Sequence, residues 1–492
     1  MSTMPTLTLE VGGGGRGHFL ARISLGIPQA SRPVSTFEPK RIATAIGTHA
    51  LVDIFDTHIR GRLIQECAAI DWSHISVVRL GYLGQAPSKC PATIVVAVRP
   101  NTLDSDGATR ILRSVGKWIY VLPQLHDVAV EVVKAGVAPG ADHVTVGIDG
   151  KVPGLGCSFE EAFRNVPALG AGLGPQDSTL AGTLGGYLSI NTADTVEYLA
   201  LTCHHVLSAI WNTMERDEKC ATLALLRIKQ EAGQISNAVR DQLFLKEYNL
   251  RQNQKRSLSL ARFSNRLGTI YCTGTGTSGG WILDWGLVKL MTGRFSSLTC
   301  IDELSPLTRI DEHGAHDKHF LHNEVAGHFP SRCPGTQWGE MTPGEMVTPG
   351  EVKRAGNRTV FKRGRTTGST KGELNMIDSS VRMRYDFDGG RYEVVEGRAL
   401  LVVSLSWPSS YFFPIAFGHR GDSGSLVFDH QGRVLGMYIG GQTQDYEAMA
   451  PSINGFHFIS PIHPTLDAIR DAAAKDPALQ GQDVKVDFVW GI

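Results

Sequence analysis

The chain has 492 residues, of which 55 are glycine and 42% are hydrophobic, and its 48 Lys and Arg residues balance 48 Asp and Glu residues. This composition is that of an ordinary globular protein, and it excludes a largely disordered chain and, because the glycines lack a three-residue period, collagen. A net charge of zero gives no support to nucleic-acid binding, which draws on a basic surface.

Membrane and secretion signals are absent from the sequence. No apolar run approaches the roughly 18 residues that a membrane-spanning helix needs. The first seven residues lack a basic segment followed by an apolar one, so no secretory signal is predicted. The eight cysteines form no Cys-x-x-Cys pair, which favours reduced, buried thiols over a disulfide framework or a zinc site. We therefore expect a cytoplasmic protein that has no membrane partner.

Residues 1–40 are rich in Gly, Pro, Ser and Thr and contain a glycine run at 12–17. A phosphate-binding loop is one interpretation of that run, but no strand and helix frame it and no Lys-Ser or Lys-Thr follows. We expect a flexible N-terminal tail here.

Residues 41–150 have the pattern of a small α/β accessory domain. Apolar spacing predicts helices over 52–70 and 104–118, and Asp104 or Ser105 is placed to cap the second. We find no cluster of nucleophile, base and orienting group here, so this domain is expected to serve binding, regulation or packing. Strands are expected at 75–80, 93–98 and 127–134, the last with one buried face.

A Gly- and Pro-rich stretch at 136–174 marks the best domain boundary, and we place the linker at 151–178. The many short strands after it favour a sandwich or barrel over a parallel sheet. We expect this β domain to span 179–476, with a helix over 464–475, and a C-terminal tail at 477–492.

Two insertions interrupt the β pattern. Residues 215–262 are charged with apolar residues near helical spacing, which predicts a helix or helix pair packed on the parent domain; a partner-binding helix is the alternative. Residues 302–350 hold five histidines between 313 and 328 but no His-Glu-x-x-His. We expect a solvated loop there and no metal site, with metal binding as the alternative.

The strongest local signal is Gly421-Asp422-Ser423-Gly424-Ser425. A serine between glycines on a tight turn exposes its hydroxyl and leaves backbone N–H groups to point at one spot. These are the nucleophile and the oxyanion donors that acyl transfer requires. A plain glycine-rich hairpin is the alternative.

A serine hydroxyl needs a base, and the base needs a carboxylate that orients it. His204 and His205 follow an apolar strand, and the spacing from Thr202 favours His205 as the base. Asp284 is the single acid in the apolar segment 280–290. A buried carboxylate is costly without a partner, and a catalytic histidine supplies one.

The order His205, Asp284, Ser423 is that of chymotrypsin-like barrels and differs from the orders of subtilisin and the α/β-hydrolases. The intervals exceed that template by about the lengths of the two insertions. Over about residues 180–470 the chain resembles the trypsin-like serine peptidases of the chymotrypsin fold, specifically their disulfide-poor, intracellular fungal members. The resemblance rests on Leu201-Thr-Cys-His-His-Val206, Leu283-Asp-Trp-Gly-Leu287, Lys362-Arg-Gly-Arg-Thr-Thr-Gly-Ser-Thr-Lys-Gly372 and Gly421-Asp-Ser-Gly-Ser425.

The resemblance implies a mainly β fold, a chymotrypsin-like double β-barrel, here with a small N-terminal α/β domain and a helical insertion. It implies that Ser423 is the nucleophile, His205 the general base and Asp284 the residue that orients it. The N–H groups of Gly421 and Ser423 then form the oxyanion hole.

Two departures from the family pattern concern the activation of the enzyme and its substrate pocket. No Ile-Val-Gly-Gly activation sequence precedes the barrel, so Asp422 needs a partner other than a freshly cut N-terminus, or the site is held inactive until something reorders it. Phe417 stands where basic-specific relatives carry an acid, which implies an apolar or restricted pocket. Gly440 and Gly441 lie where the substrate backbone should pair.

We therefore expect a serine endopeptidase that hydrolyses a protein or peptide substrate through an acyl-enzyme, without a cofactor and without nucleic acid. A regulatory partner would bind through the N-terminal domain or the helical insertion. The alternatives are a catalytically silent protease-like scaffold and a metal-responsive regulator that uses the His-rich loop. Self-cleavage in the linker at 136–174 is a further hypothesis.

Overall fold

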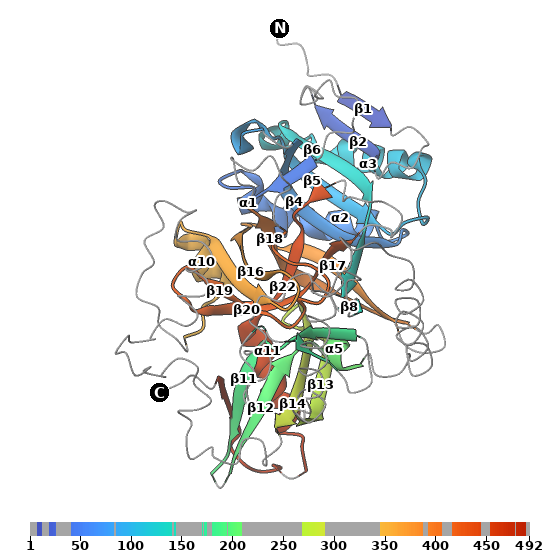
Figure 1. Cartoon of the computed structure of the whole chain (residues 1–492). Helices are drawn as coiled ribbons and strands as arrows, with labels where there is room; N and C mark the ends of the chain where they lie inside the picture. The colour runs from blue at the N-terminus through green and yellow to red at the C-terminus, as the bar shows by residue number, and fades with distance from the viewer. Residues whose placement is uncertain are drawn as a thin grey trace, which may run out of the picture.

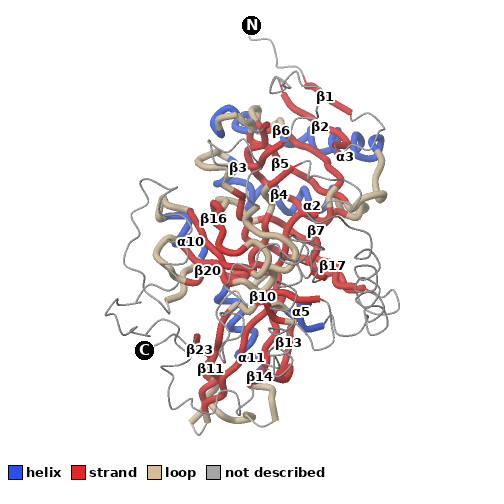
Figure 2. The backbone as a smooth tube through the Cα atoms, in the orientation of Figure 1, coloured by secondary structure: helices blue, strands red, loops and turns tan. Residues whose placement is uncertain are grey.

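Three groups of strands succeed one another along the molecule in the computed structural model (Figure 1). An N-terminal sheet lies at one end, a closed barrel in the middle, and a second β unit at the other end. Strands predominate in the described part of the chain (Figure 2). The structure describes residues 7–11, 19–25, 41–82, 85–139, 142–143, 170, 172–174, 180–193, 195–208, 268–290, 345–386, 392–405, 416–443, 453–477 and 479–488.

The N-terminal sheet is centred on two strands that are buried almost throughout, β4 and β5. Helix α3 (Ser105–Ile119) carries the chain from β5 to the parallel strand β6. Asp104 caps this helix by accepting a hydrogen bond of 2.7 Å from the Gly107 N–H, which selects Asp104 over Ser105. The strand order is β3 (Arg41–Thr44), β4 (Trp72–Tyr82), β5 (Ala92–Val98), β6 (Val128–Lys134), β2 (Phe19–Leu25), β1 (Leu7–Val11).

Two strands in the predicted flexible tail correct that expectation. β1 and β2 form a hairpin, and β2 pairs with β6. Leu20 and Ile23 on β2 are buried in the N-terminal core. The Gly-rich composition around the hairpin concealed a strand whose apolar residues find a partner only in the folded sheet.

The predicted helix over 52–70 and the predicted solvent face of β6 also differ from the structure. The helix is divided into α1 (Leu51–Ile54), the π-helix η1 (Phe55–Ile59) and α2 (Arg60–Glu66). Arg60 turns inward, where it donates to the carbonyl of Asp378 at 2.7 Å. On β6, Glu131 is fully buried because Arg41 lies 2.7 Å away and Arg22 3.3 Å away. Long-range ion pairing therefore buries the residue that marks a polar face in the sequence.

Six strands of the described chain close into the middle barrel. Each pairs antiparallel with the next, and the last pairs with the first. The barrel interior contains Val402, Phe417, Tyr438 and Ile459. The order around the barrel is β15 (Thr359–Gly364), β16 (Gly368–Leu374), β18 (Tyr392–Ser404), β22 (His457–Pro461), β20 (Val434–Thr443), β19 (Leu426–Asp429).

The second β unit packs against the C-terminal helix α11 (Ile462–Ala473), which confirms the helix predicted over 464–475. A small sheet lies near it, in which β10 (Leu180–Thr183) pairs with both β8 (Asp142–His143) and β9 (Gly172–Leu173). The main strand order is β23 (Lys485–Phe488), β11 (Gly186–Asn191), β12 (Val196–Thr202), β14 (Trp281–Leu290), β13 (Gly268–Ser278).

The N-terminal sheet and the barrel are continuous. β4 pairs with β17 (Ser379–Asp386), and β17 pairs with the barrel strand β18. β3 pairs with β21 (Ile453–Asn454), and β7 (Gly136–Pro139) pairs with the barrel strand β20. Asn375 joins them further, because its side chain accepts from the Ile46 N–H and donates to the Val77 carbonyl, both at 2.8 Å. The two regions thus share backbone pairing and buried hydrogen bonds.

The remaining helices of the described chain are η2 (Pro87–Lys89), η3 (Pro123–Leu125), α10 (Pro349–Arg354) and α5 (His204–Ser208).

Several predictions fall outside the described residues. They are the helical insertion at 215–262, nearly all of the His-rich loop at 302–350, and most of the linker at 151–178. Among the helices that the structure does describe, none combines the length and the apolar character that a bilayer crossing needs.

Candidate active site

The three predicted catalytic side chains come from separate elements of the second β unit and the barrel. His205 lies on α5, immediately after β12. Asp284 lies within β14, which pairs with β12. Ser423 lies on the turn that precedes β19. Pairing of β12 with β14 therefore places the histidine-bearing end of one strand beside the acid of the other.

His205 and Asp284 form a buried pair. His205 Nδ1 lies 2.6 Å from Asp284 Oδ2, and the His205 backbone N–H donates to Oδ1 at 3.3 Å. Burial by itself would raise the pKa of Asp284, but the charge and hydrogen bonds of His205 lower the pKa of Asp284 on balance. The carboxylate is thus ionised, and it holds a proton on Nδ1 and leaves Nε2 as the basic nitrogen.

The neighbouring histidine has a different environment. The His204 ring meets the Tyr385 ring edge-on, with the centroids 6.1 Å apart. Burial lowers the pKa of His204. Its Nδ1 has no hydrogen-bond partner in the described part of the chain. Of the two predicted candidates, only His205 is held by Asp284.

The turn of Ser423 lies next to the His205 segment, because a Cβ on Gly424 would be 3.3 Å from Cys203 N, but no hydrogen bond joins Ser423 to His205 Nε2. Ser423 Oγ donates to the Ile439 carbonyl at 3.4 Å. His205 Nε2 has no hydrogen-bond partner among the residues that the structure describes. Hydrogen bonds of catalytic groups are often long or misaligned without substrate and tighten in the complex. The structure thus brings His205 and Asp284 together and leaves the final contact with Ser423 open.

The turn around Ser423 depends on its glycines. Gly421 has φ of 90° and Gly424 has φ of 97°, in the region that favours glycine. A Cβ on Gly421 would collide with Thr366 Oγ1. Thr183, on β10, steadies the turn by donating from Oγ1 to the Gly421 carbonyl at 2.9 Å. No sequence motif pointed to Thr183, because it lies 238 residues from Gly421.

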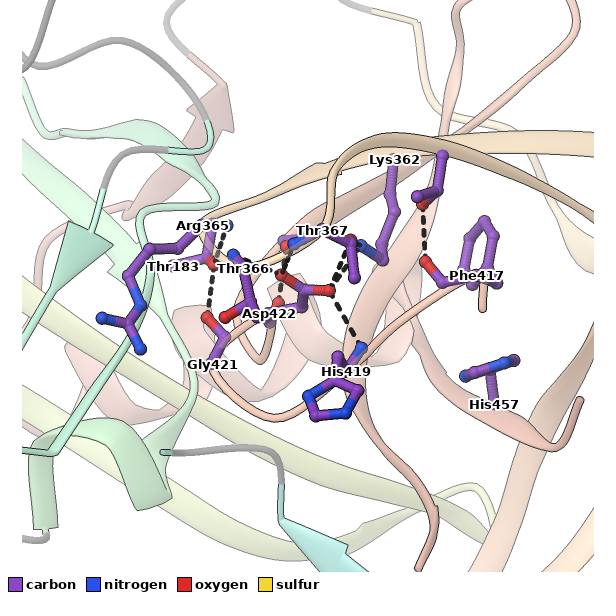
Figure 3. A network of polar contacts seen from close by, with 12 residues as sticks. Thr183, Lys362, Arg365, Thr366, Thr367, Phe417, His419, Gly421, Asp422 and His457 are labelled. Atoms are coloured by element: carbon purple, nitrogen blue, oxygen red, sulfur yellow. Dashed lines mark hydrogen bonds and ion pairs between the residues drawn. The ribbon is translucent and has the colours of Figure 1, made fainter. Parts of the chain in front are cut away.

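Asp422 has a partner within the barrel (Figure 3). Lys362 Nζ lies 2.9 Å from Asp422 Oδ2, and both side chains are completely buried. The Thr367 hydroxyl donates to Oδ2 at 2.6 Å, and the Thr366 N–H donates to Oδ1 at 2.8 Å. The His419 N–H also donates to Oδ2, at 3.0 Å. Asp422 is therefore partnered by residues of the barrel and does not need a freshly cut N-terminus.

In this pair, the surroundings of Asp422 favour its charged carboxylate form. Burial would raise the pKa of Asp422, but Lys362 and the surrounding donors lower the pKa of Asp422. Burial lowers the pKa of Lys362, against the attraction of Asp422. A buried pair of this kind is costly to disrupt from one side, since the remaining charge has no compensation. The Lys362 side chain therefore helps to hold the turn that bears Ser423.

Aromatic rings fill the region behind the predicted substrate pocket. Phe417 is fully buried, and its ring centroid lies 5.7 Å from that of His457 and 6.5 Å from that of Tyr438. A Cβ on Gly441 would lie 3.1 Å from Tyr438 Oη, and a Cβ on Gly418 would lie 2.8 Å from it. The Tyr438 ring thus ends between Gly418 and Gly441.

His457 completes this aromatic group as a neutral side chain. Burial lowers its pKa to about 3. Its Nε2 lies 3.0 Å from the Ser404 hydroxyl. No positive or negative charge therefore faces Gly441 from His457.

Cys203, His205 and Asp284 are close enough together to be considered as metal ligands. A thiol must lose its proton to bind a metal. Burial raises the pKa of Cys203 well above its usual value, and its Sγ donates to the Tyr438 carbonyl at 3.5 Å. Asp284 and His205 already satisfy one another. The donor set therefore fits a hydrogen-bonded pair of His205 and Asp284 better than a metal centre.

The sequence matches no family model and no curated protein. The solved structures that are similar to this chain include three proteases. Thermobifida fusca protease A is 13% identical, with 61% of this chain and 95% of that chain covered and a TM-score of 0.25. Cellulomonas bogoriensis chymotrypsin is 17% identical, with 40% and 71% covered and a TM-score of 0.19.

The third structure is a glutamic-acid-specific serine protease that uses a histidine triad in substrate binding. It is 14% identical, with 58% of this chain and 96% of that chain covered, and the TM-score is 0.21. The closed barrel, the adjoining β unit and the site between them define a mainly β, chymotrypsin-like fold, as the sequence predicted.

Proposed function

We propose that this protein is a serine endopeptidase. The observation that carries the proposal is the buried contact of 2.6 Å between His205 Nδ1 and Asp284. The turn that bears Ser423 lies against the same segment, since a Cβ on Gly424 would come within 3.3 Å of the backbone nitrogen of Cys203. His205 Nε2 would take the Ser423 proton as Oγ attacks the substrate carbonyl. The same proton would then pass to the leaving amine, and water would hydrolyse the acyl-enzyme. The N–H groups of Gly421 and Ser423 would stabilise the oxyanion.

The Asp422 contacts support a nucleophile turn that forms without cleavage of the N-terminus. Lys362 supplies inside the barrel the positive charge that a new N-terminus would otherwise provide. We infer that folding alone shapes the turn. Control of the enzyme would then act on substrate access, through the N-terminal domain or a regulatory partner.

The aromatic residues favour a substrate with a small residue before the scissile bond. Phe417 and Tyr438 are buried in the barrel, with Lys362 Nζ 5.6 Å from the centroid of each ring, and Tyr438 Oη approaches the positions of Gly418 and Gly441. Glycine or alanine would fit beside these rings, whereas a lysine or arginine would meet the positive charge of Lys362, and the carboxylate of Asp422 is already paired.

Active-site labelling tests the proposal. A fluorophosphonate probe should label the wild-type protein, and Ser423→Ala should abolish the labelling. His205→Ala should suppress it strongly, while the matched control His204→Ala should keep it, because only His205 is bonded to Asp284. Equal labelling of wild type and Ser423→Ala would refute the nucleophile assignment.

A catalytically silent scaffold is the second candidate, and it is favoured because no residue that the structure describes, Ser423 included, is hydrogen-bonded to His205 Nε2. A wild-type protein that folds but is not labelled would establish this alternative.

Self-cleavage in the Gly- and Pro-rich stretch at 136–174 belongs to the first candidate, since β7 brings the start of that segment onto β20. Intact mass would then show a shorter chain in the wild type and the full-length chain in Ser423→Ala. We further propose a cytoplasmic location, which fractionation would test.

A further inference from the structure

One strand of the N-terminal region lies on the barrel beside the nucleophile. β7 pairs antiparallel with the end of β20, and the register places Gly136 opposite Thr443 and Pro139 opposite Gly440. β7 leaves the N-terminal sheet directly after β6. Figure 2 shows it below β4, β5 and β6. The pairing is therefore a contact between the accessory region and the part of β20 that the sequence marks for substrate pairing.

The contacts on the opposite edge of β20 show which backbone N–H groups of β20 point towards β7. The Gln442 N–H donates to the Phe456 carbonyl at 3.0 Å, so it points away from β7. Successive backbone N–H groups of a strand point in opposite directions, and Gly441 and Thr443 therefore face β7. Ala138 is opposite Gly441 in the register. Pro139, which has no N–H, is opposite Gly440, where none is needed.

This edge of β20 is the one that leads to Ser423. The Ile439 carbonyl accepts the Ser423 hydroxyl, and Ile439 lies two residues before Gly441 on β20. β22 occupies the opposite edge of β20 from Gly436 to Gly441. A peptide that adds a strand to β20 on its way to Ser423 must therefore use the edge that β7 covers.

The direction of β7 is also that of a peptide approaching the nucleophile. Because the pairing is antiparallel, β7 advances from Thr443 towards Gly440, and thus towards Ile439. Ala138 has the position that a substrate residue bound to Gly441 would have. The backbone of β7 reproduces the path of a bound peptide up to the residue opposite Gly440.

The accessory region holds β7 firmly in place. Val137 is buried in the main core. One residue before β7, the Ala135 N–H donates to the Val98 carbonyl at 2.8 Å, and the Ala135 carbonyl accepts from the Ser73 hydroxyl at 2.7 Å. A tethered strand has a high effective concentration at its site, so a free peptide competes at a disadvantage.

We propose that β7 is an intramolecular occupant of the peptide-binding edge of β20, which a substrate must displace. The proposal rests on the proposed protease function. The accessory region would control substrate access through the pairing of β7 with β20. The regulatory element would be the segment Gly136–Pro139.

Replacement of one N–H group tests the proposal. Ala138→Pro removes the donor that faces Gly441, and the matched control Ala138→Ser keeps it. With an alanine- or glycine-containing peptide substrate, Ala138→Pro should lower KM about three- to tenfold with kcat unchanged, as loss of one backbone hydrogen bond predicts. Ala138→Ser should keep the wild-type KM. Fluorophosphonate labelling, which needs no pairing with β20, should be the same in all three proteins.

A second measurement uses the wild-type protein alone, in case the proline variant does not fold. Amide hydrogen exchange of residues 136–139 should speed up when a peptidyl boronate with an Ala-Pro-Ala sequence binds, because the inhibitor displaces β7. Normal labelling together with an unchanged KM in a folded Ala138→Pro would overturn the inference about β7 alone, and so would unchanged or slower exchange. Absence of labelling in the wild type would instead overturn the protease function.

Discussion

Two buried aspartates support the site in different ways. Asp284 is bonded to His205, and His205 keeps a second nitrogen, Nε2, without a partner in the described part of the chain. Asp422 is bonded to Lys362 and also to hydroxyl and backbone donors from Thr366 and Thr367. The first pair is open on one side, which suits a group that must transfer a proton. The second is saturated, which suits a group that only holds a turn in place.

Replacement of Asp284 should produce the largest loss of activity. Asp284→Asn keeps the shape but presents the wrong tautomer of His205, and we expect kcat to fall by about four orders of magnitude. Peptide hydrolysis by the purified variant measures this. Asp284→Asn should remain folded, so a variant with nearly normal kcat would show that the His205–Asp284 pair has no role in catalysis.

Replacement of Lys362 should produce the largest loss of stability. Lys362→Met leaves Asp422 buried without a countercharge, and the free energy of unfolding should fall by about 3–5 kcal/mol. Denaturant unfolding measures the change. Lys289→Met is the matched control, because its ion pair with Glu197 is largely exposed and should contribute about 1 kcal/mol at most. Similar losses in the two variants would contradict the distinction between a buried and an exposed pair.

Acid should weaken the saturated pair. The pKa of Asp422 is lowered in the folded protein, so the stability that its charge contributes is present above the unfolded pKa, about 3.9, and is lost as pH falls through the folded pKa. Below about pH 4 the unfolding free energy of the wild type should therefore decrease more steeply than that of Asp422→Asn, by up to about 1.4 kcal/mol per pH unit. Parallel pH profiles for the two proteins would exclude this contribution.

Tyr385 should have the smallest effect. Burial raises the pKa of this phenol well above its usual value, and the neighbouring Asp284 raises it further. Tyr385→Phe removes a polar neighbour of Asp284 while keeping the ring, and we expect kcat to fall about two- to tenfold at unchanged KM. Steady-state kinetics measure this split. A rise in KM without a change in kcat would place Tyr385 in substrate binding instead.

The local sequence indicated those candidate site residues that lie in short, recognisable motifs. A serine between glycines, a histidine after an apolar strand and a lone acid in an apolar segment each have few structural explanations. Their chain order indicated the fold class. It could also be predicted that Asp284 needs a buried partner, since an unpaired carboxylate in such a strand is costly.

Other parts of the site depend on contacts between distant segments. Thr183 reaches the nucleophile turn across 238 residues, and Lys362 reaches Asp422 across 60 residues. The strand β2, within a Gly-rich region, becomes recognisable only once β6 lies beside it. A single sequence contains no signal for such pairings, because strand partners are chosen by complementary surfaces in the folded sheet.

By itself the sequence determined the mainly β character of the chain and indicated the candidate site residues and their order, because these follow from strand and turn patterns and from local chemistry. Only the tertiary structure decided between His204 and His205 through contact with Asp284. It also decided the partner of Asp422 and the position of β7 on β20. Hydrogen bonds and ion pairs act over a few ångströms, so these choices are made when folding brings the segments together.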